Sequence, residues 1–147
     1  MALDFGSAPR RIRRRISGYV AADATPVTGQ QTSKMRNYFF PRPSDRIGFS
    51  AISIAELFSG FKGRSRENKN RQELEQFLDS PRVVVHVIDE GSADFYAAIL
   101  NNLRAAGTPI PTNDIWIAAT AFQHGYKLYS KDEHFRLIPG LVQFRES

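Results

Sequence analysis

The segment 111–140 constrains the fold most strongly, because it reads as one helix that leads directly into one strand. Apolar residues between 115 and 122 recur at helical spacing, and Gly125 follows as a typical helix end. The next segment, 127–129, is short and has the composition of a strand. A helix joined to a strand by so short a connection is the repeating unit of α/β proteins, so the segment favours that class.

The rest of the chain from residue 46 onward continues the alternation of strands and helices. Strands are expected at 47–52, 83–88 and 141–144, and helices after residue 53, at 71–78 and at 92–106. The β-branched run 83–88 is almost unbroken, which is typical of a strand covered on both faces. We therefore expect an α/β fold, a three-layer α/β/α sandwich with a mainly parallel central sheet, and residues 1–147 as a single domain.

Composition limits the classes of protein to which the chain can belong. It has no cysteine, so neither a disulfide nor a thiolate-bound metal holds the fold together. No apolar run reaches the roughly 20 residues of a membrane span, and the basic N-terminus lacks the apolar segment of a secretory signal. We expect a cytoplasmic protein without a membrane partner. Its net charge of +5 favours an acidic partner such as nucleic acid.

The first third of the chain is the least regular part. Five arginines fall between positions 10 and 15, and we interpret 1–18 as a basic, poorly ordered arm. A short apolar run at 19–22 follows and is expected to form a strand that ends just before Asp23.

Acidic side chains follow several of the predicted strands. Glu56, Asp114, Asp132 and Asp23 each lie shortly after an extended segment. Ligands of parallel α/β sheets gather beyond the carboxyl ends of the strands, so neighbouring strands would bring these carboxylates together. Each acid also has a structural explanation: Glu56 completes a capping box with Ser53, Asp114 suits a helix N-terminus, and Asp132 suits a turn. Their shared edge of the sheet favours a joint role.

Three or four clustered carboxylates repel one another, and a bound cation would relieve that repulsion. Oxygen ligands select Mg²⁺ or Mn²⁺, which bind phosphate oxygens and activate water for attack on a phosphodiester. Together with the basic surface, the cluster predicts a metal-dependent nuclease, with a phosphatase as an alternative. The histidines at 86, 124 and 134 share no metal-ligand spacing, and His134 is the one close enough to Asp132 to meet a substrate.

Four short motifs resemble one protein family when they are taken together. They are Ser-Ala-Ile-Ser-Ile-Ala-Glu-Leu at 50–57, Asn-Asp-Ile-Trp-Ile-Ala-Ala-Thr-Ala at 113–121, Ser-Lys-Asp-Glu-His-Phe at 130–135 and Ile-Pro-Gly-Leu at 138–141. In this order they resemble the PIN-domain family, and within it the VapC-type toxins of toxin–antitoxin pairs. The resemblance spans roughly residues 46–144. It implies a Mg²⁺- or Mn²⁺-dependent endoribonuclease, a homodimer, and a VapB-type antitoxin that blocks the active site.

The resemblance also assigns roles to individual residues. Glu56, Asp114 and Asp132 match the second, third and fourth acids of the family, and Ser53 and Asn113 match small polar residues that flank them. The first acid has two candidates. Asp23 is favoured, because it stands in an Asp-x-Thr sequence at a separation from Glu56 close to the family's habit; the other is Asp4. A chain in which neither serves would be a weakened PIN module that binds RNA or a partner protein.

Overall fold

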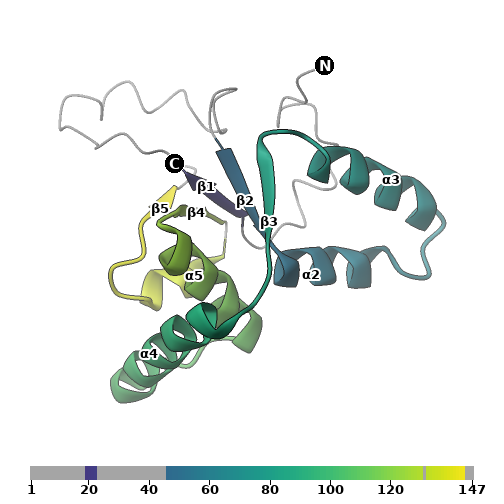
Figure 1. The fold of residues 1–147 in the computed structure, drawn as a ribbon. Helices are drawn as coiled ribbons and strands as arrows, with labels where there is room; N and C mark the ends of the chain where they lie inside the picture. Colours follow the sequence, from purple (N-terminus) through teal and green to yellow (C-terminus); the bar gives the residue numbers. More distant parts are fainter. Residues whose placement is uncertain (1–18, 23–45, 131, 145–147) are drawn as a thin grey trace, which may run out of the picture.

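The computed structural model describes residues 19–22, 46–130 and 132–144. Their helices and strands are, in chain order, β1 (Tyr19–Ala22), β2 (Arg46–Ser50), α2 (Ala51–Phe61), α3 (Glu67–Leu78), β3 (Val83–His86), α4 (Glu90–Ala106), α5 (Thr112–His124), β4 (Lys127–Tyr129), the 3-10 helix η3 (Glu133–Leu137) and β5 (Gln143–Phe144) (Figure 1). The expected basic arm, 1–18, lies outside the described residues. None of the described helices has both the length and the apolar character needed to cross a membrane.

Five strands form one sheet in the order β3-β2-β1-β4-β5. The pairs β2–β3 and β4–β5 are parallel, whereas β1 is antiparallel to both of its neighbours. Because β2 and β4 both oppose β1, they run in the same direction as each other. Four strands therefore share one direction, as the prediction of a mainly parallel sheet requires, and the exception is the central strand.

Helices cover the sheet from two sides and create two separate cores. On one side, Phe49 of β2 meets Phe77 of α3 in an edge-to-face contact with 5.7 Å between ring centroids. That core also contains Ile47, Leu57, Phe61 and Leu74. On the other side, Leu128 of β4 packs with buried residues of α4, α5, η3 and the C-cap of η3, which are Ile99, Leu103, Ile115, Ile117, Ala118, Ala119, Ala121, Phe135 and Ile138. The expected α/β/α layering is confirmed.

Local sequence signals explain several of the helix ends. Gly107 and Gly125 end α4 and α5 in the left-handed conformation that glycine adopts without strain. Asp89 and Ser92 form a reciprocal capping box at the start of α4. The capping box predicted for Ser53 and Glu56 is wrong, because α2 begins earlier. Its N-cap is Ser50, whose hydroxyl accepts a hydrogen bond from the backbone N–H of Ile52 at 3.1 Å.

Strand β3 differs from the prediction in both length and environment. It ends at His86, and Val85 and Val87 keep 41% and 65% of their surface exposed. The reason is its position at the edge of the sheet, where β2 is its one neighbouring strand among the described residues. A β-branched run marks a strand, but it does not distinguish a central strand from an edge strand. Helix α3 also begins at Glu67, one turn before the predicted start at residue 71.

Candidate metal centre

Asp114 lies in the first turn of α5 and is 4% exposed. The helix begins after Pro111, whose extended backbone carbonyl accepts a hydrogen bond from the N–H of Asp114 at 3.1 Å. No side chain caps this helix end. The carboxylate of Asp114 therefore lies near the positive end of the helix dipole, where a negative charge is favoured.

Asp132 follows β4 and starts η3. The hydroxyl of Ser130 accepts a hydrogen bond from the backbone N–H of Asp132 at 3.0 Å. Asp132 Oδ1 in turn accepts one from the backbone N–H of His134 at 3.0 Å, which makes Asp132 the N-cap of η3. The predicted turn residue is thus a helix cap, and its local bonds fix where its carboxylate lies.

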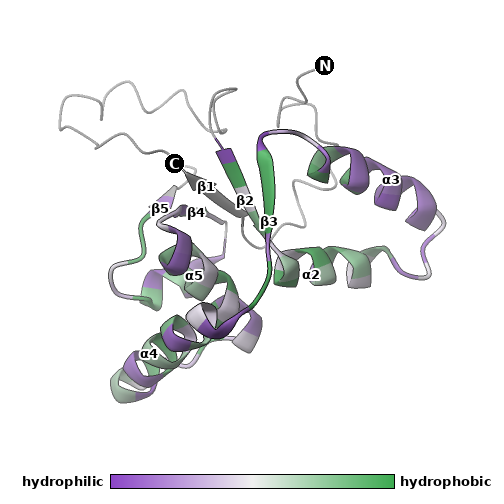
Figure 2. Cartoon of the chain, in the orientation of Figure 1, coloured by the Kyte–Doolittle hydropathy of each residue, from purple (hydrophilic) through white to green (hydrophobic). Residues whose placement is uncertain are grey.

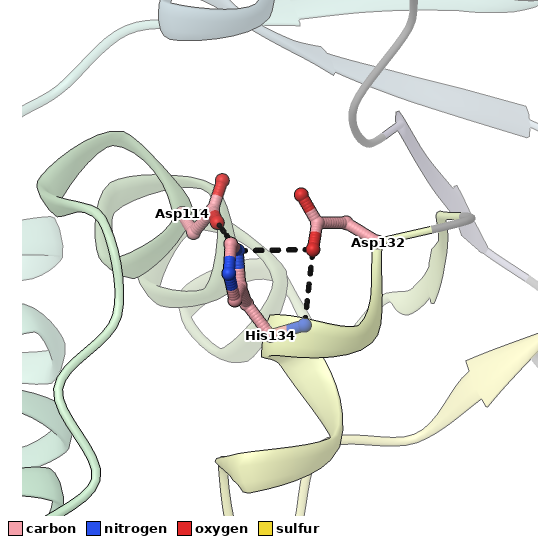
Figure 3. Close-up of side chains that lie close together, drawn as sticks. All are labelled: Asp114, Asp132 and His134. Atoms are coloured by element: carbon pink, nitrogen blue, oxygen red, sulfur yellow. Dashed lines mark hydrogen bonds and ion pairs between the residues drawn. The ribbon is translucent and has the colours of Figure 1, made fainter.

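His134 lies between the two carboxylates (Figure 3). Its Nδ1 atom is 2.9 Å from Asp114 Oδ2 and 2.9 Å from Asp132 Oδ1. One potential ligand atom from each of the three residues lies within 4.8 Å of the other two. Asp114 of α5, Asp132 at the N-cap of η3 and His134 of η3 therefore converge on one point.

The surroundings of Asp114 raise the pKa of its carboxyl group above the ordinary value. Burial is the largest cause, and the negative charges of Asp132 and Glu56 act in the same direction. The hydrogen bond with His134 and the charge of its ring act in the opposite direction. A negative charge at Asp114 is therefore costly unless a proton or a cation accompanies it.

Glu56 approaches the same site from α2. The side-chain amide of Asn113 donates a hydrogen bond to Glu56 Oε1 at 3.3 Å, which links α2 to the start of α5. Ser53 is buried one turn before Glu56 on α2, with 2% of its surface exposed. Of the two predicted flanking residues, Asn113 thus contacts Glu56, and Ser53 lies one turn before Glu56 on the same helix.

The first predicted acid, Asp23 or Asp4, lies outside the described residues, and the roles of Glu56, Asp114 and Asp132 in the site stay predictions as well. The strand that leads to Asp23 has an unexpected direction. Ala22, at the carboxyl end of β1, pairs with Arg46 at the amino end of β2. The argument that parallel strands carry Asp23 to the edge where Asp114 and Asp132 lie therefore has no support from β1.

Comparison with known proteins identifies the family. The family model described as PIN domain matches residues 35–141. This chain belongs to the PIN-domain family. The match spans every element from β2 to η3, and it includes the candidate metal centre.

The PIN domain is also similar to individual known proteins. It is 32% identical over 92 residues to ribonuclease VapC4 of Mycobacterium tuberculosis, covering 63% of this chain and 71% of that protein. It is 33% identical over 108 residues to ribonuclease VapC1 of Methanocaldococcus jannaschii, covering 73% and 77%. A structure of VapBC-1 from nontypeable Haemophilus influenzae matches with a TM-score of 0.64 and 27% identity, covering 78% and 82%. The expected resemblance to VapC-type members is confirmed.

His134 is the residue of this PIN domain that sequence reasoning placed least well. The sequence placed it close to Asp132, where it could touch a substrate, with a structural role as the more common alternative; in the structure its ring contacts both Asp132 and Asp114. The local signal was present, because a residue two positions after an N-cap acid lies in the first turn beside that acid. The contact with Asp114 could not be inferred, since the two residues belong to different elements.

The donor set of the PIN domain fits a small divalent cation. Asp114 and Asp132 offer carboxylate oxygens, the preferred ligands of Mg²⁺ and Mn²⁺, and Glu56 is close enough to influence the pKa of Asp114. A cation at this point would balance the negative charge that burial makes costly at Asp114. His134 holds the two carboxylates together through its ring nitrogen, which leaves the other oxygen of each acid outside that contact.

Proposed function

We propose that this PIN domain is a VapC-type endoribonuclease that depends on Mg²⁺ or Mn²⁺. The observation that carries the proposal is the meeting of Asp114, Asp132 and His134 at one point, with Glu56 beside them. Its relatives are named ribonucleases, which supports RNA as the substrate. A buried acid with a raised pKa, next to two further acids, is an arrangement that stability alone does not favour.

Each residue has a distinct part in the proposed reaction. Asp114, Asp132 and Glu56 would hold the ion, and its chemistry when bound would be to activate a water and neutralise charge on the phosphodiester. Asn113 orients Glu56 through its amide, and His134 keeps the carboxylates of Asp114 and Asp132 in one orientation. Asp23 remains our candidate for the first acid.

The proposal includes partners as well as a substrate. The solved relative is a VapBC complex, which supports a VapB-type antitoxin as a protein partner of this chain. We expect the antitoxin to cover the acid cluster, and we expect a homodimer, as the family resemblance implies. We place the reaction in the cytoplasm, where a toxin would meet RNA.

Cleavage of RNA by the purified protein tests the function. The wild type should cleave a structured RNA in the presence of Mg²⁺ or Mn²⁺ and lose that activity in EDTA. Asp114→Asn should lower the cleavage rate at least a hundredfold, because it removes a charged ligand from the ion. Asp94→Asn is the matched control, since Asp94 is exposed on α4 and remote from the cluster in sequence. Equal activity of the wild type and Asp114→Asn would refute the assignment.

A second function is favoured by the direction of β1. If no first acid reaches the cluster, the chain is a weakened PIN module that binds RNA or a partner protein without cleaving RNA. Titration with Mn²⁺ separates the two functions, because a complete site should bind the ion and raise the melting temperature by mass action. A module that binds RNA but neither binds Mn²⁺ nor cleaves would support the second function.

A further inference from the structure

The turn between α2 and α3 carries a concentration of positive charge. Lys62, Arg64, Arg66 and Lys69 are exposed there; we call these four residues the hairpin cations. Figure 2 shows the connection between the two helices, and the nearby part of α3, in the colour of hydrophilic residues. Apart from Glu67 in its first turn, the acids of α3 lie farther along the helix, at Glu73, Glu75 and the C-cap Asp79. The positive charge is therefore concentrated at the turn that joins α2 to α3.

The backbone and side chains of this turn are held in place by a single acid. Glu67 accepts a hydrogen bond from the backbone N–H of Gly63 at 2.8 Å and pairs with Arg71 at 3.4 Å. The guanidinium of Arg71 lies 4.1 Å above the ring of Phe58 on α2, so it ties the two helices together. Gly63 has a φ of 71°, which a glycine adopts at little cost. The turn is thus a built structure with a fixed shape.

The hairpin cations have no comparable structural task. Glu67 is the only acid between residues 57 and 72, and it is engaged by Gly63 and Arg71. Within 46–130 and 132–144, none of the four cations forms an ion pair with another described residue. Arg66 is the N-cap of α3 and Lys69 lies in its first turn, where the helix dipole disfavours a positive charge. Stability of the fold therefore does not explain why these positions are basic.

The hairpin cations lie within reach of the proposed catalytic site. Lys62 is six residues beyond Glu56, and Glu56 stands on α2. A rise of 1.5 Å per residue places Lys62 about 9 Å farther along the helix axis. A stacked nucleic-acid strand advances about 3.4 Å per nucleotide, so this distance corresponds to about three nucleotides. A strand bound at the acid cluster can therefore extend along α2 to the turn.

We propose that the hairpin cations bind the phosphate backbone of the RNA substrate on one side of the cleavage site. The proposal rests on the proposed RNA substrate and adds where and how RNA is held. Lys62 would meet a phosphate about three nucleotides from the acid cluster, and Arg64, Arg66 and Lys69 would meet phosphates beyond it. These contacts carry no base specificity, because they involve only the backbone.

The magnitude of the effect follows from counterion release. Each phosphate neutralised on a single strand contributes about 0.7 to the slope of log affinity against log salt concentration. Replacing Arg64 and Arg66 should therefore reduce that slope by about 1.4. Between 50 and 200 mM KCl this corresponds to a change of about sevenfold in the ratio of variant to wild-type Kd.

Binding of RNA without catalysis tests the proposal. The Kd of a fluorescein-labelled, mixed-sequence 20-nucleotide RNA is measured by fluorescence anisotropy in EDTA, at 50, 100 and 200 mM KCl. The double variant Arg64→Gln/Arg66→Gln is compared with the control Arg46→Gln/Arg104→Gln, which removes the same charge from exposed positions on β2 and α4. The hairpin variant should bind more weakly than the control, with the smaller salt slope. Melting temperatures of both variants, expected near that of the wild type, show that the fold is intact.

The possible results separate this proposal from the proposed function. Equal RNA affinity and equal salt slope in the two variants would overturn the role of the hairpin cations, even if the wild type cleaves RNA. A hairpin variant that keeps its RNA affinity but loses binding to poly-L-glutamate would assign the surface to an acidic protein instead. A wild type that binds no RNA at 50 mM KCl would overturn both proposals. If the wild type does not cleave RNA but the two variants still differ in RNA affinity, only the enzyme assignment would be overturned.

Discussion

Replacing Asp114 by Asn should stabilise the protein in the absence of divalent ions, although Asp114 is buried in the native fold. An oxygen of Asp114 and one of Asp132 lie within 4.8 Å, so two negative charges there repel by about 3 kcal/mol at an effective dielectric constant of 20. Asn removes this repulsion, and its weaker hydrogen bond with His134 costs about 1 kcal/mol. Because Asp132 is one-third exposed, water screens part of the repulsion. The expected net gain in the free energy of unfolding is about 1–2 kcal/mol.

The same substitution should have the opposite consequence when a divalent ion is present. An ion at a hundred times its Kd stabilises the wild type by about 2.7 kcal/mol, because it binds the folded state alone. For a chain of this length 1 kcal/mol shifts the melting temperature by about 2–4 °C, so the wild type should gain about 5–11 °C. Asp114→Asn should gain little, since it lacks a charged ligand.

The dependence on pH follows from the raised pKa of Asp114. A carboxyl group whose pKa is higher in the folded state binds protons more readily there, so its stabilising effect is present at low pH. It is lost as pH rises through the folded-state pKa. The stability advantage of Asp114→Asn should therefore be larger at pH 7.5 than at pH 4.5.

Thermal melts at both pH values, in EDTA and in excess Mn²⁺, measure all three effects. Asp94→Asn on the exposed side of α4 is the control and should follow the wild type in every condition. A variant Asp114→Asn that melts below the wild type in EDTA would refute the electrostatic reasoning. Equal gains from Mn²⁺ in the wild type and the variant would refute the ligand assignment.

Three further predictions concern the sheet and its helices. Gly48→Ala should lower the free energy of unfolding by about 1–3 kcal/mol in urea titrations, because the new Cβ would lie 2.5 Å from a ring carbon of Tyr126. Tyr126 is held by His86 through a 2.8 Å hydrogen bond, and Tyr126→Ala should remove most of that cost in the double variant. Burial and the neighbouring His124 lower the pKa of His86. The contribution of neutral His86 to the free energy of unfolding should therefore be fully present above pH 6.5 and be lost as pH falls through the folded-state pKa. His86→Gln should reduce this loss, as measured by urea titrations between pH 7.5 and 5.5. Asp89→Ala should lower the melting temperature in thermal melts, because the capping box of α4 is lost.

Prediction from the sequence worked best where the determining interactions are local. Gly107 and Gly125 ended the expected helices, because a left-handed residue closes a helix through its own backbone bonds. The start of α2 was misplaced because Ser50 and Ser53 are both plausible caps by their chemistry. Only the geometry of the preceding strand made Ser50 the N-cap.

In the candidate site, too, the parts set by local sequence were predicted and the contacts between distant residues were not. Glu56, Asp114 and Asp132 were predicted from motifs, since each follows an element end that the sequence marks. The bridging position of His134 was not predicted, because its contact with Asp114 joins residues twenty positions apart. The edge position of β3 was also missed, since side-chain pattern reports the type of an element and not its neighbours.

For this protein, the sequence alone determined the α/β class and the family, and it supplied Glu56, Asp114 and Asp132 as candidates for the acid cluster. These follow from periodicity, end signals and motifs, which act over a few residues. Only the tertiary structure decided that β1 runs against its neighbours, that Asn113 meets Glu56, and that His134 joins two carboxylates. The physical reason is that strand direction and side-chain contact depend on packing between distant segments, which no local pattern encodes.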